Sequence, residues 1–151
     1  MNGDDLVFLL DSSVLVKLFH RQEVNSDLAL LLREGHLGGG WEIRIADLVF
    51  YELANALHYV GKYSADEIIE GIQSLLSLEL RIYDFDARIL HSTLALCQEK
   101  KLSIYDAYLV ALAKREQLTF ITADEKLCRK FHSDSAVLAL EQFSVGSDEE
   151  N

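Results

Sequence analysis

The sequence predicts one α/β domain, residues 1–145, in which a mostly parallel sheet lies between two layers of helices. Three observations support this three-layer α/β/α fold. Strand-like and helix-like segments alternate along the chain. The first strand-like segment, LVFLL (6–10), is continuously apolar, as parallel strands buried on both faces are. The chain has no proline and no linker-like stretch. The last six residues, GSDEEN (146–151), form an acidic tail that we expect to be disordered.

The first third of the chain predicts two strands and two helices. After the strand at 6–10, apolar residues at helical spacing predict a helix over 12–21 and a second over 25–33. The glycine-rich segment EGHLGGGW (34–41) predicts a loop. The following segment, EIRIAD (42–47), predicts a short strand.

The middle of the chain continues the alternation. LVFYELANALHYV (48–60) has a wide apolar face and predicts a helix that ends at a glycine. The next predicted helix, 64–78, begins with a Ser-x-x-Glu capping box. A strand over 80–85 and a helix over 87–101 follow.

The last third repeats the pattern. A helix is predicted over 103–117, and a Ser-x-x-Asp box from Ser103 to Asp106 marks its start. LTFIT (118–122) predicts a strand, DEKLCRKF (124–131) a short helix, and AVLALE (136–141) a last strand. Since parallel neighbours require crossover connections, these helices are expected on both faces of the sheet.

Composition excludes several functional classes. No apolar run approaches the roughly 18 residues of a membrane span, and acidic residues precede 6–10 where a signal peptide would be basic. We therefore expect a cytoplasmic protein. The two cysteines, Cys97 and Cys128, and the five scattered histidines have no zinc-site spacing. The net charge of −11 argues against a broadly basic nucleic-acid-binding face.

Four acidic residues are expected to meet at one edge of the sheet. Asp11 ends the first strand, and Asp124 lies two residues past the strand at 118–122. Glu52 and Asp106 lie early in their helices. The carboxyl ends of parallel strands line the ligand crevice. Each acid also has an ordinary explanation, because aspartate favours helix N-caps and N-terminal turns, and Glu52 suits a solvated position.

Several carboxylates at one edge would repel one another and raise each other's pKa. Mg²⁺ or Mn²⁺ would relieve this repulsion, because such ions take oxygen ligands and keep several waters. A bound ion could then activate water for hydrolysis of a phosphate ester. The hydroxyls of Ser12, Ser13 and Thr122 are suited to orient the carboxylates, or to form caps and turns.

Four segments resemble the signature segments of the PIN-domain ribonucleases: LLDSSVLVKLF, ADLVFYELANAL, SIYDAYLVALAKR and LTFITADEKL. The nearest likeness is to the VapC-like toxins of toxin–antitoxin pairs. This resemblance implies that Asp11, Glu52, Asp106 and Asp124 are catalytic metal ligands. It also implies Mg²⁺-dependent cleavage of RNA, a homodimer, and inhibition by a small antitoxin protein. Asp47 departs from the family pattern, where a small residue or proline is usual; it would cap its helix or add an acid.

Basic residues follow two of the acids and are candidate RNA phosphate contacts: Lys17, Arg21, Lys126, Arg129 and Lys130. They are equally consistent with solvated helix faces. The leucine-rich segment that ends in Trp41 fits either an interface or core packing. For Asp84 and Asp86 we expect plain turn positions.

Other functions fit less well. A haloacid-dehalogenase-like phosphatase needs a second aspartate at position 13, which is serine, and a receiver domain needs a lysine where Glu141 lies. No glycine fingerprint for nucleotides is present. An RNA-processing nuclease and a non-catalytic PIN binding or assembly module stay open as alternatives.

Overall fold

Five parallel strands form one sheet, in the order β3-β2-β1-β4-β5. The structure is a computed structural model that describes residues 6–145, so the acidic tail predicted at 146–151 lies outside the described residues. The strands are β1 (Val7–Leu10), β2 (Glu42–Ala46), β3 (Arg81–Tyr83), β4 (Thr119–Thr122) and β5 (Val137–Ala139). The prediction of a parallel sheet is confirmed.

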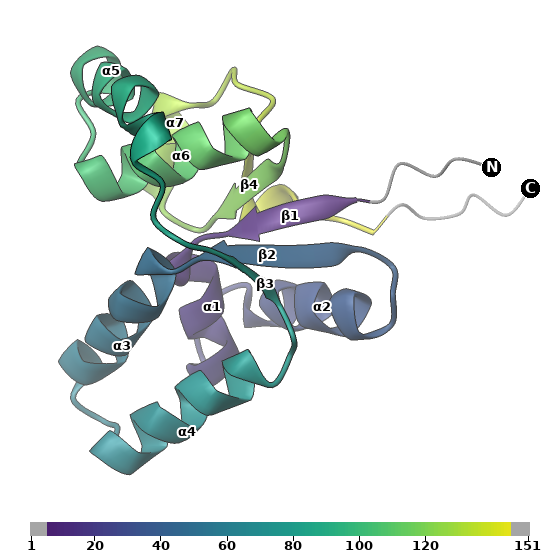
Figure 1. Cartoon of the computed structure of the whole chain (residues 1–151). Coiled ribbons are helices and arrows are strands. Elements are labelled where there is room, and N and C mark those ends of the chain that lie inside the picture. The colour runs from purple at the N-terminus through teal and green to yellow at the C-terminus, as the bar shows by residue number, and fades with distance from the viewer. Residues whose placement is uncertain (1–5, 146–151) are drawn as a thin grey trace, which may run out of the picture.

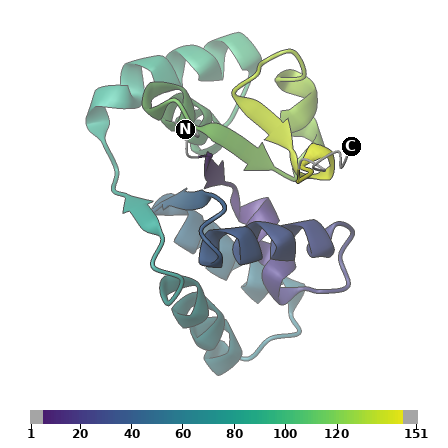
Figure 2. The same ribbon diagram turned by 90° about the vertical axis from the view of Figure 1, so that its right-hand side faces the viewer.

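Helices cover both faces of this sheet, as Figures 1 and 2 show. One layer contains α1 (Ser12–Phe19), α2 (Ser26–Leu37), α3 (Leu48–Val60) and α4 (Ala65–Leu76). The other contains α5 (Leu90–Lys100), α6 (Ile104–Glu116) and α7 (Glu125–Lys130), and short 3₁₀ turns, η1 (Ala87–Ile89) and η2 (Leu140–Gln142), precede α5 and follow β5. The strand order reverses direction between β1 and β4, which is where ligands bind in open sheets of this kind.

The burial of the central strands explains their apolar sequences. Leu9, Ile45 and Phe120, in the three central strands, are fully buried, as expected for strands covered on both faces. Residues 107–113 of α6 are all buried, and three of them are alanines, which allow close packing against the sheet. Within residues 6–145, no helix combines the length and the apolar character needed to cross a bilayer.

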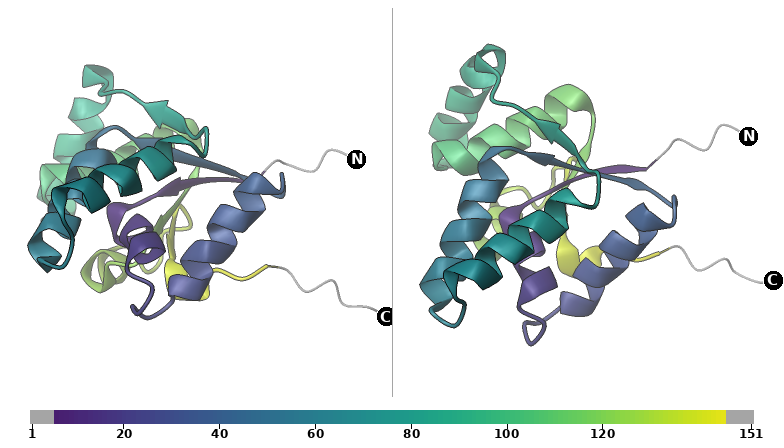
Figure 3. Two further views of the ribbon diagram at one scale, coloured as in Figure 1. Left: turned by 90° about the horizontal axis from the view of Figure 1, so that it is seen from below. Right: turned by 60° about the horizontal axis from the view of Figure 1, so that its bottom comes forward.

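The second helix is longer than predicted. α2 continues to Leu37, so residues 34–37, expected in a loop, are helical. Gly35 lies in this extension, directly against the indole ring of Trp41, whose Nε1–H donates to the carbonyl of Leu32 at 2.8 Å. Trp41 also packs edge-on against Phe8. The contacts of Trp41 therefore match the core-packing interpretation. Figure 3 shows α2 beside the C-terminal segment that includes η2.

Gly35→Ala is expected to destabilise the protein by about 1–3 kcal/mol, because the added methyl would overlap the Trp41 ring. Helix propensity alone would favour alanine by up to about 1 kcal/mol. The overlap therefore decides whether the substitution raises or lowers the free energy of unfolding. Gly40→Ala is the matched control, since its added methyl would meet ordinary contact distances of 3.5 Å or more. Urea denaturation measures both. A stabilised Gly35→Ala variant would contradict this packing.

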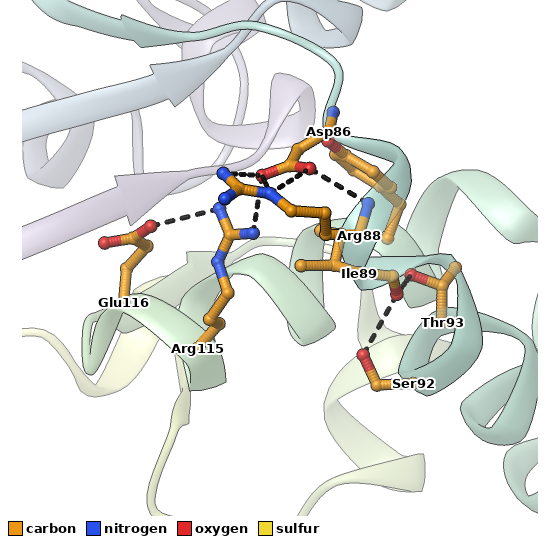
Figure 4. Close-up of polar contacts among 8 residues, drawn as sticks. Asp86, Arg88, Ile89, Ser92, Thr93, Arg115 and Glu116 are labelled. Atoms are coloured by element: carbon orange, nitrogen blue, oxygen red, sulfur yellow. Dashed lines mark hydrogen bonds and ion pairs between the residues drawn. The ribbon is translucent and has the colours of Figure 1, made fainter.

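Asp86 is an ion-pair centre rather than the plain turn residue expected (Figure 4). Its carboxylate accepts bonds from Arg88 Nη2 at 2.9 Å and from Arg115 Nη1 at 2.7 Å, and Arg115 also contacts Glu116. Hydrogen bonds from the two guanidinium groups hold the pKa of Asp86 well below its usual range. The interaction ties η1 to the end of α6. A partner 29 positions away cannot be read from local sequence.

Two smaller expectations also need correction. The Ser64–Glu67 capping box is complete, but at the start of α6 only the Asp106 N–H to Ser103 Oγ bond forms, at 3.3 Å. Asp47 precedes α3 without a side-chain cap bond. Its Oδ2 instead accepts the N–H of Phe85 at 3.2 Å, so it ties the start of α3 to the chain after β3.

Candidate active site

The carboxylate of Asp11 is buried where β1 ends and α1 begins. Asp11 is only 5% exposed, and its Oδ1 accepts the N–H of Ser12 at 2.8 Å. It is thus the N-cap of α1, the ordinary role considered from the sequence. Burial raises the pKa of Asp11, and the charge of Asp124 adds to the rise, whereas the hydrogen bonds that Asp11 accepts lower it. A carboxylate can cap a helix without being buried, so the burial of Asp11 needs a further explanation.

Two hydroxyl groups hold the other oxygen of Asp11. Ser13 Oγ and Thr122 Oγ1 both donate to Asp11 Oδ2, at 2.8 and 2.7 Å. The same hydroxyls accept the backbone N–H groups of Ala123 at 2.9 Å and of Asp124 at 3.1 Å. The end of β4 therefore fixes the orientation of a carboxylate on β1, across the point where the strand order reverses.

Thr122→Val is expected to lower the free energy of unfolding by about 1.5–3 kcal/mol, because a hydrogen bond to a charged group is lost. Thr93→Val is the matched control. Thr93 is equally buried, but its hydroxyl donates to the backbone carbonyl of Ile89 within the same helical segment, and losing such a neutral bond typically costs about 1 kcal/mol. Urea denaturation at pH 8 compares them. Equal losses would mean that Thr122 is an ordinary core threonine.

Glu52, in the second turn of α3, has one oxygen without a partner. Among the described residues, its buried Oε1 accepts no hydrogen bond. Burial, followed by the charges of Asp11 and Asp106, raises the pKa of Glu52 to about 7, and the side chain of Ser12 opposes the rise. Buried polar atoms in folded proteins are nearly always hydrogen-bonded. A lone carboxylate oxygen beside two further acids is therefore a position that a cation would stabilise.

Asp106, the third residue of α6, is half-buried in the same cluster. Burial raises the pKa of Asp106, and the charges of Asp11 and Asp124 raise it further, while Ser103 and Lys130 lower it. Its backbone N–H donates to Ser103 Oγ at 3.3 Å. The carboxylate therefore lies within the electrostatic influence of two other acids of the group.

Asp124 is more exposed and partly committed to the fold. Its Oδ1 accepts the N–H groups of Lys126 at 2.9 Å and of Leu127 at 3.2 Å, which makes it the N-cap of α7. Its charge nevertheless raises the pKa of Asp11 and of Asp106. Asp124 therefore belongs to the same cluster, with one oxygen used for the cap.

The four predicted acids are therefore electrostatically coupled: the charges of Asp11 and Asp106 act on Glu52, and the charge of Asp124 acts on Asp11 and Asp106. In the part of the chain that the structure describes, no three Asp, Glu, His or Cys side chains are yet arranged to hold a metal ion. The residue types fit Mg²⁺ or Mn²⁺, which prefer carboxylate and water oxygens. The unpartnered Glu52 Oε1 is the observation that favours such a ligand.

The five predicted basic residues occupy two places. Lys17, on α1, pairs with Glu23 at 3.1 Å and its side chain is only 12% exposed, while Arg21 is exposed after the end of α1. The other three lie on α7 and are all exposed: Lys126, Arg129 and Lys130.

The sequence did not predict a cavity of about 370 Å³ that lies beside the acids. Thr122 contributes to its wall and also donates to Asp11, so the cavity and the acid cluster are neighbours. Its charged and amide side chains are Lys17, Asn25, Glu125, Arg129 and Glu141. They come from α1, the α1–α2 loop, α7 and η2, and no local pattern brings such distant segments together.

Comparison with known families gives one match over most of the chain. The family model described as PIN domain matches residues 8–131. This range contains the four acids and both hydroxyl residues that hold Asp11. A search of the curated proteins found no match.

Solved structures share the fold. The crystal structure of PAE2754 from Pyrobaculum aerophilum is 24% identical, with a TM-score of 0.64 over 90% of this chain and 85% of that one. A chain of a toxin–antitoxin complex from Klebsiella pneumoniae is 23% identical, with a TM-score of 0.62 over 87% and 96%. VapC20 from Mycobacterium tuberculosis, a sarcin–ricin loop cleaving toxin, is 14% identical, with a TM-score of 0.61 over 81% and 93%. At these identities the likeness establishes the fold alone.

Proposed function

The chain belongs to the PIN domain family, and on this premise we propose that it is a metal-dependent endoribonuclease that hydrolyses RNA phosphodiester bonds. The observation that carries the proposal is the buried, unpartnered Oε1 of Glu52 beside the like charges of Asp11 and Asp106. A folded protein keeps such an arrangement at a cost in stability, which a functional ligand would explain.

In this proposal Asp11, Glu52, Asp106 and Asp124 hold Mg²⁺ or Mn²⁺. The bound ion would supply an activated water and neutralise charge on the phosphoryl oxygens. Ser13 and Thr122 orient the Asp11 carboxylate through the hydrogen bonds to its Oδ2. Ser12 acts on Glu52 in the same supporting role.

RNA would reach the acids past a narrow basic edge rather than a broad basic face. The proposed phosphate contacts are Lys17, Arg21, Lys126, Arg129 and Lys130. The net charge of −11 means that few cations oppose the backbone charge of RNA. Binding should therefore be weak and lose strength with added salt, with a slope set by the small number of contacts.

We further propose that the protein is the toxin of a toxin–antitoxin pair, acting in the cytoplasm as a single domain and as a homodimer. Two of the similar structures are a toxin–antitoxin complex and a sarcin–ricin loop cleaving toxin. A cognate antitoxin protein would then be its inhibitor.

An RNA cleavage assay tests the nuclease proposal. Full-length protein is incubated with a mixed-sequence RNA in Mg²⁺, in Mn²⁺, and in EDTA. We expect internal cleavage in at least one metal and none in EDTA. A protein that leaves RNA intact in both metals would instead be a non-catalytic PIN module.

A further inference from the structure

The cavity beside the acid cluster has the position and size of a ligand subsite. It lies at the carboxyl ends of β4 and β5, next to the point where the strand order reverses and ligands bind in such sheets. Its volume of about 370 Å³ falls within the range of about 300–1,000 Å³ typical of small-molecule sites. Thr122 lines the cavity and donates a hydrogen bond of 2.7 Å to Asp11.

The charges around Cys128 show how close the cavity is to the acids. This half-buried thiol lines the cavity. Burial raises the pKa of Cys128, and so do the charges of Asp124, Glu141 and Asp11, in that order. Cys128 is therefore close enough to Glu141, Asp124 and Asp11 for each of these carboxylates to influence it. A group bound in the cavity would sit directly beside a group bound at the acids.

The polar side chains of the cavity have unused hydrogen-bonding capacity. Among the described residues, the side chains of Glu125, Arg129 and Glu141 make no hydrogen bond or ion pair. Asn25 has a left-handed backbone, with φ of 63°, and its side chain makes no cap bond to α2 although it precedes that helix. Donors and acceptors are thus both available, which suits an uncharged polar ligand better than a phosphate.

Apolar groups complete the lining. Val24, which is 77% exposed, lies at the cavity together with Ala123, Ala139 and Leu140. A planar heterocycle needs both apolar contacts and hydrogen-bond partners, and the lining supplies both kinds of group. In single-stranded RNA, the bases are unstacked and present such edges to a protein.

We propose that this cavity binds the base of the nucleotide next to the scissile phosphate and selects guanine; the proposal rests on the nuclease function above. In this inference Arg129, which lines the cavity, contacts the base rather than a phosphate. Guanine offers O6 and N7 as acceptors, the pair that an arginine recognises. The same base carries N–H donors on its Watson–Crick edge, which the carboxylate of Glu141 accepts. Uracil lacks the N7 acceptor and the exocyclic amino group, so it satisfies neither partner fully.

Base selection is tested by binding, separately from cleavage. Short fluorescent RNAs, one all-uridine and one with a single central guanosine, are titrated with full-length protein in EDTA and again with Ca²⁺. The variants are Glu141→Gln and Arg129→Gln, and the control is Glu99→Gln, an exposed glutamate on α5 away from this cavity. Thermal unfolding confirms that each variant folds. Cleavage of both RNAs is then followed in Mg²⁺ and Mn²⁺.

We expect the wild type and Glu99→Gln to bind the guanosine RNA at least about tenfold more tightly than the all-uridine RNA. Both cavity variants should lose most of this preference. Equal binding of the two RNAs by the wild type, or equal weakening of both by the variants, overturns the inference whether or not RNA is cut. A guanine preference without cleavage in either metal supports the cavity assignment and defeats the nuclease proposal.

Discussion

Asp106→Asn is expected to reduce RNA cleavage by more than about 100-fold while leaving the protein folded. Loss of even an outer partner of a metal ligand typically reduces affinity or activity 10–100-fold, and Asp106 is proposed as a ligand itself. Its carboxylate is half-buried, with a pKa raised by burial and by Asp11 and Asp124. Asparagine keeps the shape but removes the charge that would bind the cation.

The matched control for this experiment is Asp27→Asn. Asp27 is exposed in the first turn of α2, so the variant makes the same chemical change outside the group of four acids and should retain full activity. Cleavage rates are measured in Mg²⁺ and in Mn²⁺ at several concentrations. Activity of Asp106→Asn within tenfold of the wild type would remove Asp106 from the site.

The metal-free protein is expected to lose stability as the pH rises from about 4.5 to about 7. Glu52 has an ordinary pKa of 4.5 and a folded-state pKa of about 7. The native state therefore binds more protons than the unfolded state in this window, so the free energy of unfolding falls as they are released. After allowance for partial exposure and screening, we expect a fall of about 1–2 kcal/mol.

Urea denaturation in EDTA at pH 5, 6, 7 and 8 measures this dependence. Excess Mg²⁺ should restore stability at pH 8, because an ion bound to the folded state alone stabilises it. Glu52→Gln should flatten the dependence. The pKa of Asp134 is lowered by its bond with Lys114. This group therefore raises the free energy of unfolding as the pH rises, but only at lower pH. A stability that rises from pH 5 to 8 in EDTA would contradict the burial of these charges.

The sequence was sufficient for the features that local pattern encodes. Continuous apolar runs predicted the buried strands, and helical spacing predicted the helices between them. Asp11 and Asp124 could be placed at strand ends because a carboxylate follows an apolar run. The coupling of all four acids then followed from the rule that parallel strands end at one edge.

Most of the features that were missed depend on partners far along the chain. Gly35 is an exception: local rules assign its glycine-rich segment to a loop, but it is helical and packs against Trp41, six positions further on. The pairing of Asp86 with Arg115 spans 29 positions. The cavity joins a loop, a helix and the chain after the last strand. Such features become visible only when the fold brings these segments together.

The four acids also show why single residues are ambiguous. Asp11 and Asp124 both cap helices, as their positions predict, and both contribute charge to one cluster. A cap bond needs only one oxygen of a carboxylate, so finding a capping role does not exclude the proposed ligand role. Asp124 illustrates this, since its two cap bonds both go to Oδ1.

We propose that the carboxylates of Asp11, Glu52, Asp106 and Asp124 bind a common divalent cation. Crystals of the full-length protein soaked in Mn²⁺ test it directly through anomalous scattering. We expect a manganese peak at ligand distance from Asp11 and Asp106, with the Glu52 carboxylate drawn toward it. Manganese bound elsewhere, with these four carboxylates unoccupied at saturating concentration, would contradict it.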